Sequence, residues 1–262
     1  MLLRHQPIPM RTLGIIPARY ASTRFPGKAL VDIMGKSMVR RTWERAGQAK
    51  RLGRVVVATD HPEIEAHVRA FGGAVVMTRP EHPSGTDRCY EALGQVAGSW
   101  DAVVNIQGDE PFIHPEQIDQ LVEALAATDA PIATLVRAVT DPTVLTDPNA
   151  AKVVRDARGR ALYFSRHGVP FRRDVPPTDW LRGHTYYQHV GMYAYRLGAL
   201  AQVVRLPPSP LERAESLEQL RWLEAGIPIQ TEITEWENFG IDTPEDLARI
   251  EGLAGARDAK SC

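Results

Sequence analysis

The residues that most clearly suggest chemistry are three cations that follow a short apolar run near the start of the chain. Residues 13–16 predict a buried strand that breaks at Pro17. The loop beyond it carries three cationic side chains among small residues and prolines: Arg19, Arg24 and Lys28. Small residues let backbone N–H groups approach an anion, and the cations neutralise its charge. The loop matches neither the Walker pattern nor the dinucleotide-binding glycine pattern. It therefore predicts a different phosphate site, the alternative being a solvated loop whose arginines face water.

A second candidate is the acidic turn in residues 105–112, Asn-Ile-Gln-Gly-Asp-Glu-Pro-Phe. It follows an apolar run that predicts a central strand, and ligands of open α/β sheets bind beyond the carboxyl ends of such strands. Gly108 allows a sharp turn that would push Asp109 and Glu110 into the crevice. A carboxylate beside phosphates can hold Mg²⁺, and we favour Asp109 because it follows the glycine directly. The alternative is a turn with two solvated acids.

A further carboxylate, Asp242, precedes a predicted helix that begins at Thr243 and Pro244. Mg²⁺ usually takes one or two carboxylates together with phosphates and water, so Asp242 is a candidate second ligand. Asp or Thr before a proline is also an ordinary helix cap. On the residues of this segment, the cap is the preferred interpretation.

A third group of residues could bind an acidic ligand that carries several hydroxyls. Arg166 can hold a carboxylate bidentately, and His189 and Tyr193 share one face of a predicted strand. Glu212 and Gln219 lie seven residues apart, which places them on one face of a single predicted helix. Taken one at a time, these residues are better explained by core packing or by a structural histidine.

Composition limits the possible partners. The chain has 262 residues, 44% hydrophobic and 24% charged, with a net charge of −1, so no overall field favours nucleic acid or an anionic membrane. Residues 1–60 nevertheless hold 12 Lys/Arg and 3 Asp/Glu, a balance of +9 that suits a small anionic ligand. The two cysteines have no metal or disulfide spacing, which predicts a reducing, cytoplasmic compartment. The sequence has no run of about 18 apolar residues that would predict a transmembrane helix.

Strand and helix patterns alternate, which predicts βαβ layers around a largely parallel sheet. The predicted strands are residues 13–16, 55–59, 74–77, 102–106, 132–139, 186–195 and 229–234, and the predicted helices are 62–71, 84–97, 115–127, 211–225 and 244–254. Residues 152–155 and 161–165 predict a hairpin, and residues 171–183 an exposed excursion. We expect one domain over residues 12–253 with a β-rich insertion around 150–196, a flexible extension at 1–11 and a flexible tail at 254–262.

Blocks of sequence along the chain follow the order found in one known family. They are residues 15–30, 58–60, 78–79, 84–86, 105–111, 149, 152–154, 161–166, 189–196, 209–212, 217–221 and 242–247. Over residues 12–253 the chain resembles the 3-deoxy-manno-octulosonate cytidylyltransferases. The first block is shared loosely with sialic acid cytidylyltransferases, whereas residues 161–166 together with 209–221 resemble this family specifically.

The resemblance implies a three-layer α/β/α domain of the nucleotide-diphospho-sugar transferase type, with a mostly parallel mixed sheet and usually in a homodimer. It implies transfer of CMP from CTP to the 2-hydroxyl of an acidic eight-carbon sugar (Kdo), with release of pyrophosphate, for lipopolysaccharide biosynthesis. Mg²⁺ is the implied cofactor, and neither nucleic acid nor membrane insertion is expected.

The resemblance also implies roles by position. The residues implied for CTP are Ala18, Arg19, Arg24, Lys28, Arg79, Ser84 and Asp109, with Arg79 and Ser84 near the cytosine. Asp109 and Asp242 become the metal ligands, which replaces the cap interpretation of Asp242. The implied catalytic residues are Arg19, Lys28, Asp109 and Asp242. The implied sugar pocket consists of Gln107, Arg166, His189, Tyr193, Glu212 and Gln219. Residues 236–239 and 172–184 depart from the family pattern, the first near Asp242 and the second at the expected dimer contact.

Overall fold

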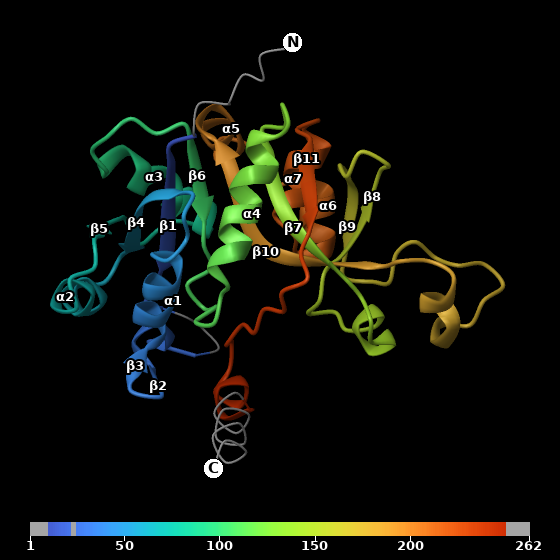
Figure 1. The fold of residues 1–262 in the computed structure, drawn as a ribbon, viewed down its shortest axis with the longest axis horizontal. Helices are drawn as coiled ribbons and strands as arrows, with labels where there is room; N and C mark the ends of the chain where they lie inside the picture. The colour runs from blue at the N-terminus through green and yellow to red at the C-terminus, as the bar shows by residue number, and fades with distance from the viewer. Residues whose placement is uncertain (1–9, 22–24, 250–262) are drawn as a thin grey trace, which may run out of the picture.

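The structure, a computed structural model, describes residues 10–21 and 25–249. Its centre is a nine-stranded sheet with helices in front of it and behind it (Figure 1). The elements in chain order are β1 (Thr12–Ala18), η1 (Lys28–Leu30), β2 (Asp32–Ile33), β3 (Lys36–Ser37), α1 (Met38–Ala46), β4 (Leu52–Thr59), α2 (Pro62–Ala70), β5 (Val75–Met77), α3 (Gly85–Gln95), β6 (Ala102–Asn105), α4 (Pro115–Ala126), β7 (Ile132–Ala138), η2 (Pro142–Leu145), β8 (Lys152–Arg155), β9 (Ala161–Ser165), η3 (Pro177–Arg182), β10 (Tyr187–Arg196), α5 (Leu197–Val203), α6 (Pro210–Glu215), α7 (Gln219–Glu224) and β11 (Ile229–Ile233). The expected tail at 254–262, residues 1–9 of the expected extension, and Arg24 lie outside the described residues.

The sheet confirms the expected mixed, mostly parallel arrangement. Its main order is β11-β7-β10-β6-β1-β4-β5. Strands β6, β1, β4 and β5 run parallel to one another, and so do β11 and β7. The long strand β10 is antiparallel to both β6 and β7 and joins the two parallel groups. The predicted hairpin is present as β8 and β9, and β8 also pairs with β10.

Alternation along the strands divides the core into two layers. Leu13 and Ile15 of β1 face the layer that α3, α5 and α7 cover. Ile16 of the same strand faces the opposite layer, which α1, α2 and α4 cover. Each helix contributes an apolar stripe to its layer, such as Ile118, Leu121, Val122 and Leu125 of α4. The three-layer α/β/α prediction is therefore confirmed.

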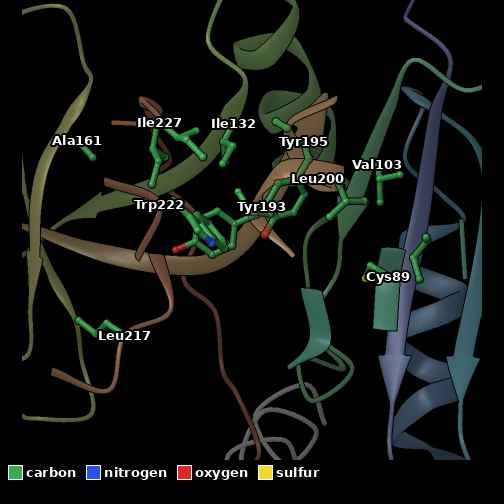
Figure 2. Packing of buried hydrophobic residues seen from close by; sticks show 14 of the residues in the cluster. Cys89, Val103, Ile132, Ala161, Tyr193, Tyr195, Leu200, Leu217, Trp222 and Ile227 are labelled. Atoms are coloured by element: carbon green, nitrogen blue, oxygen red, sulfur yellow. The ribbon is translucent and has the colours of Figure 1, made fainter. Parts of the chain in front are cut away.

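The first layer is built around a group of large aromatic side chains (Figure 2). The ring of Trp222 on α7 packs edge-on against Tyr193 at 4.9 Å and Tyr195 at 5.6 Å, both on β10. Edge-to-face pairs are the favoured geometry for aromatic rings and add to the gain from burial. This packing fixes α7 against the part of the sheet that lies beside the candidate site.

Strand β1 is longer than predicted. It continues through Pro17 to Ala18, where Pro17 pairs with Ala58 of β4. The other neighbour, β6, pairs with β1 only up to Ile15. Pro17 lacks an N–H, but no β6 residue is paired with it, so its presence removes no hydrogen bond from that ladder. The prediction that the strand breaks at Pro17 was therefore wrong, and the phosphate-like loop starts two residues later, at Arg19.

The helix predicted for residues 211–225 was also wrong as a single element. It forms two helices, α6 and α7, separated at Ser216, which has a left-handed backbone with φ of 51°. The carbonyls of Glu215 and Ser216 accept hydrogen bonds from the Arg166 guanidinium, at 2.6 and 2.9 Å. These tertiary contacts offset the strain of a non-glycine residue in this conformation. Glu212 and Gln219 consequently do not share one helix face.

The excursion at residues 171–183, which contains η3, projects from the body of the molecule (Figure 1). Phe171 is exposed as predicted, but Trp180 is buried in a small separate core with Leu145 and Tyr186. The sequence patterns also did not indicate α1, α5 or the short β2–β3 ribbon. Among the described residues, none of the helices is long and apolar enough to cross a membrane.

Candidate active site

A cavity of about 310 Å³ opens beyond the carboxyl ends of β1 and β6. Seven of the predicted site residues line it: Ala18, Arg19, Lys28, Ser84, Gln107, Asp109 and Asp242. They come from four separate parts of the chain, and the parallel strands bring them to one edge of the sheet. The cavity is therefore the candidate active site.

Two aspartates from distant segments meet at one lysine in this cavity. Lys28 Nζ lies 2.7 Å from Asp109 Oδ2 and 2.9 Å from Asp242 Oδ1. Burial disfavours the ammonium, but the attraction of the two carboxylates outweighs it and raises the pKa of Lys28 above its ordinary value. The lysine is therefore charged at neutral pH, and the carboxylates converge on a single positive centre.

The Asp109 turn is held close to β1. Gly108 approaches so closely that a Cβ added there would lie 2.8 Å from the Pro17 carbonyl oxygen. On the other side, Thr42 Oγ1 donates to the Gly108 carbonyl at 3.3 Å. The Asp109 carbonyl accepts from Ile241 N at 2.9 Å. This last bond ties the segment that carries Asp242 directly to the turn that carries Asp109.

The segment 234–241, which we call the strap, connects β11 to Asp242. The Trp236 ring stacks on His114 at the start of α4, with centroids 4.2 Å apart, and the Asn238 amide donates to the Glu110 carboxylate. The departure from the family pattern at residues 236–239 thus consists of side chains that anchor the strap. Burial, reinforced by the charge of Asp109, raises the pKa of Glu110 to about 7. Glu110 contacts the strap while Asp109 reaches Lys28, as the preference for Asp109 anticipated.

The cap interpretation applies to Thr243 but not to Asp242. Thr243 Oγ1 accepts from Asp246 N at 3.2 Å, so it caps the helix that follows. The Asp246 carboxylate in turn accepts from the backbone N–H groups of Asp242 and Thr243. The Asp242 carboxylate is left to point at Lys28, which the residues of this segment did not reveal.

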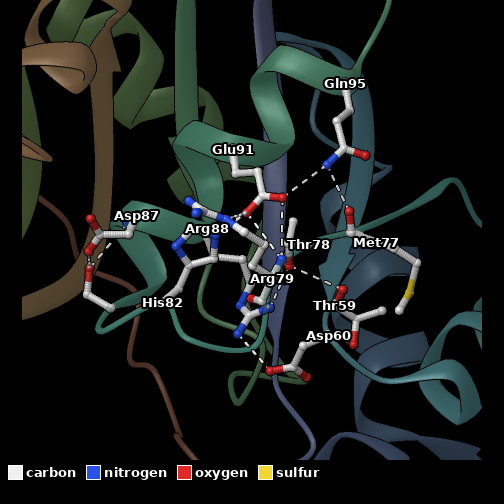
Figure 3. Close-up of polar contacts among 11 residues, drawn as sticks. Thr59, Asp60, Met77, Thr78, Arg79, His82, Asp87, Arg88, Glu91 and Gln95 are labelled. Atoms are coloured by element: carbon white, nitrogen blue, oxygen red, sulfur yellow. Dashed lines mark hydrogen bonds and ion pairs between the residues drawn. The ribbon is translucent and has the colours of Figure 1, made fainter.

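A buried ion pair joins Arg88, which lines the cavity, to Asp60 (Figure 3). The Arg88 guanidinium bonds Asp60 Oδ2 at 2.8 Å and Thr78 Oγ1 at 2.5 Å, and it also lines the cavity. Its side chain is 4% exposed. Asp60 additionally accepts from Tyr20 N at 3.3 Å, so this one ion pair joins the phosphate-like loop to β4 and α3. The sequence analysis had missed Arg88, although the helical pattern placed it one turn after Ser84.

His82 is a second lining residue that the sequence analysis missed, and Arg79 lies differently from the expectation. His82 bonds Glu91 of α3, and Glu91 also accepts from the backbone and side chain of Arg79 (Figure 3). The Arg79 side chain is 74% exposed and does not line the cavity. Ser84 lines the cavity and caps α3 through a bond from Asp87 N.

We expect the Asp60–Arg88 pair to contribute strongly to stability. Asp60→Ala leaves a buried guanidinium without its charge partner and should lower the free energy of unfolding by about 3 kcal/mol or more. Urea unfolding followed by circular dichroism measures the change. Glu65→Ala removes the partner of Arg69, whose side chain is 66% exposed, and should cost about 0.5 kcal/mol or less. Equal costs for the two variants would contradict the structural importance of the buried pair.

The six predicted sugar residues separate into two groups. The ring centroids of His189 and Tyr193 lie 5.2 Å apart, and a Cβ added at Gly191 would lie 3.9 Å from Gln107 Cγ. Gln219 lies on α7, whose Trp222 packs on Tyr193. Of these four residues Gln107 lines the cavity, while the largely buried side chains of His189, Tyr193 and Gln219 lie on β10 and α7 and do not line it.

Arg166 and Glu212 are engaged elsewhere. The Arg166 guanidinium donates to three backbone carbonyls, those of Pro148, Glu215 and Ser216. Glu212 forms a bidentate ion pair with Arg221, at 2.7 and 2.5 Å. A residue that the sequence analysis missed, Glu215, accepts from Ser165 Oγ and Arg166 N at 2.8 and 2.9 Å. It fastens α6 to the end of β9.

Several buried polar atoms on β6, β10 and α7 have no hydrogen-bond partner in the described part of the chain. They are Asn105 Oδ1, Tyr193 Oη, Tyr195 Oη and Gln219 Nε2. Buried polar groups are normally paired, so such a group calls for an explanation such as a polar ligand or water. His189 differs, because it bonds Thr134 Oγ1 at 2.9 Å and burial lowers its pKa to about 3. It is therefore a neutral side chain at physiological pH.

Comparison with known proteins identifies the class to which this fold and site belong. The profile of the cytidylyltransferase family matches residues 13–238, so the chain belongs to that family. A relative from Cytophaga hutchinsonii, a 3-deoxy-manno-octulosonate cytidylyltransferase, is 52% identical over 91% of this chain and 95% of its own length. One of the same name from Bacteroides thetaiotaomicron is 53% identical over 92% and 97%. The chain is a member of the 3-deoxy-manno-octulosonate cytidylyltransferase family.

Solved structures agree with this assignment. A CMP:2-keto-3-deoxy-manno-octonic acid synthetase complexed with CTP superposes with a TM-score of 0.87 and 41% identity, over 94% of this chain and 99% of its own. A 4-diphosphocytidyl-2C-methyl-D-erythritol synthase from Anaerococcus prevotii has a TM-score of 0.61 at 13% identity over 94% and 97%, and shows the shared fold.

Proposed function

We propose that this chain transfers CMP from CTP to the 2-hydroxyl of 3-deoxy-manno-octulosonate and releases pyrophosphate, in the cytoplasm and for lipopolysaccharide biosynthesis. The observation that carries the proposal is the convergence of Asp109 and Asp242 on Lys28 inside a cavity at the carboxyl edge of the sheet. The family membership and the CTP complex of a similar structure support the nucleotide and the sugar.

The donor set in the cavity fits Mg²⁺. Two carboxylate oxygens already converge on a cation, the Lys28 ammonium, within 2.9 Å. The described residues contain no group of three or more His, Cys, Asp or Glu placed to hold a metal. Two carboxylates are nevertheless sufficient when phosphates and water complete the coordination. We infer that Asp109 and Asp242 would hold Mg²⁺, which when bound would supply positive charge beside the reacting phosphate.

The residues of the chain position the reactants and neutralise charge. Arg19 and Lys28 line the phosphate end of the cavity and would bind the triphosphate, with Arg24 as a further proposed contact. The sugar hydroxyl would attack the α-phosphorus in line with the leaving pyrophosphate, a reaction in which positioning and electrostatic stabilisation carry most of the catalysis. Ala18 and Ser84, which also line the cavity, would face the cytosine.

The sugar would lie beside Gln107, His189 and Tyr193. Its hydroxyls would supply partners for the unpaired Tyr193 hydroxyl and Gln219 amide. Because Arg166 and Glu212 are bound to other groups, their direct contact with the sugar requires a rearrangement of α6, and we propose them as sugar residues only in that rearranged state. The homodimer implied by the resemblance is also part of the proposal, and sedimentation velocity tests it.

A pyrophosphate-release assay tests the function. The purified chain is incubated with Mg²⁺, CTP and either 3-deoxy-manno-octulosonate or a sialic acid, with UTP in place of CTP as the nucleotide control. We expect release with CTP and the eight-carbon acid, and little with the other combinations. Release only with the sialic acid would assign the chain to a different acid sugar. Binding of CTP without release across the panel would indicate a nucleotide-binding protein without catalytic activity.

A further inference from the structure

The Lys28 ammonium is placed where a bound divalent cation would be needed. Its Nζ contacts Asp109 Oδ2 at 2.7 Å and Asp242 Oδ1 at 2.9 Å, and both are charge-assisted hydrogen bonds. The Lys28 side chain is 18% exposed, so the contact is partly shielded from water. The same two carboxylates form the proposed metal site.

One position between two carboxylates cannot accept two cations. Oxygen ligands of Mg²⁺ lie about 2.0–2.1 Å from the ion, so a metal held by both aspartates would lie close to the ammonium that now bonds one oxygen of each. An ammonium left among them would also repel the metal directly. The ammonium and a divalent cation therefore compete for the two carboxylates.

An anion in the same cavity can draw Lys28 away. The lysine side chain is a flexible four-carbon stem with a compact charge and three donors, so it can exchange carboxylate oxygens for phosphate oxygens without moving the backbone. Arg19 lines the same cavity, so an incoming triphosphate would meet two positive groups there.

We propose that Lys28 and the divalent cation are alternative partners of Asp109 and Asp242, so that the metal site forms only when a triphosphate displaces the lysine. In the nucleotide-free protein, Lys28 neutralises two carboxylates that would otherwise repel each other, and it competes with metal. When the triphosphate binds, Lys28 passes to the phosphates and the carboxylates become available. The inference rests on the proposed function for the identity of this anion and for the metal site at Asp109 and Asp242.

If Lys28 competes with the metal, removing its charge should increase the affinity of the protein for a divalent cation. Mn²⁺ serves as the probe, and electron paramagnetic resonance measures free Mn²⁺ in the absence of nucleotide. The uncharged variants Lys28→Met and Lys28→Gln should bind Mn²⁺ at least about tenfold more tightly than the wild type, because both charge-assisted hydrogen bonds that compete with the metal are lost. Lys28→Arg keeps the competing charge and should remain near the wild type.

Two controls locate the effect. The double variant Lys28→Met/Asp109→Asn should lose the gained Mn²⁺ affinity, because one of the two carboxylates is missing. Thermal unfolding verifies that each variant is folded. Two different uncharged replacements are used so that a folding defect in one of them does not decide the result. A lysine with a merely structural role predicts unchanged or weaker Mn²⁺ binding in folded Lys28→Met and Lys28→Gln, and that result would overturn the proposal. Because no nucleotide or sugar is present, the outcome is independent of the pyrophosphate-release assay.

Discussion

Asp109→Asn should lower kcat for pyrophosphate release by about 10³-fold or more. The substitution keeps the shape of the side chain but removes the charge that faces Lys28 at 2.7 Å and that would hold Mg²⁺. Stabilisation of developing charge by a metal is worth several kcal/mol, and each 1.36 kcal/mol corresponds to a factor of about ten in rate. Steady-state assays at saturating CTP and sugar, over a range of Mg²⁺ concentrations, measure the effect.

The fold of this variant should remain intact, because the backbone contacts of the turn do not use the charged group. Asp101→Asn changes an exposed aspartate that pairs with Arg11 and should retain full activity. Asp242→Asn should also lose most activity, and combining it with Asp109→Asn should cost less than the product of the two single losses, since both carboxylates serve one cation. High turnover of Asp109→Asn with Mg²⁺ present would exclude Asp109 from the reaction.

The prediction succeeded where local patterns determine the structure. The apolar run that became β6 and the capped helix that became α3 could be recognised from a few neighbouring residues, because periodicity and capping are local properties. The phosphate-like loop and the acidic turn were found because cations or carboxylates followed predicted strands. Their meeting in one cavity then followed from the parallel arrangement of those strands.

The prediction failed where distant contacts decide the structure. The helical pattern is interrupted at Ser216 because Arg166 bonds the carbonyls of the turn. No residue within residues 211–225 indicates this interruption. The role of Asp242 came only from the family resemblance, since a carboxylate before a proline has the same local signature whether it caps a helix or faces a lysine. Arg88 went unnoticed because its partner Asp60 lies 28 residues away.

Within the candidate site, the contacts that each side chain makes elsewhere account for predicted residues that do not line the cavity. Ser84 and Gln107 line it, while the Arg79 side chain points to solvent and to Glu91. Arg166 was expected to face the sugar because arginine suits carboxylates. Three nearby carbonyls satisfy its donors instead, which a sequence pattern does not reveal.

Gly108→Ala should lower kcat/KM by about 100-fold, although it adds only one methyl group. The added Cβ would lie 2.8 Å from the Pro17 carbonyl oxygen, and neither the end of β1 nor the turn can yield without moving Asp109 relative to Lys28. A displacement of about 1 Å at a reacting site costs on the order of 10² in rate. Overpacking should also lower the free energy of unfolding by about 1–3 kcal/mol.

The matched control is Gly240→Ala, two residues before Asp242. A Cβ there would meet nothing within 4 Å, so the variant should keep the activity and stability of the wild type. Steady-state kinetics and urea unfolding of both variants separate a steric effect at the turn from a general effect of replacing glycine. If Gly108→Ala kept wild-type kcat/KM, the close approach of the turn to β1 would not be what positions Asp109. The placement of that carboxylate would then have to come from the strap, through the bond from Ile241 N to the Asp109 carbonyl.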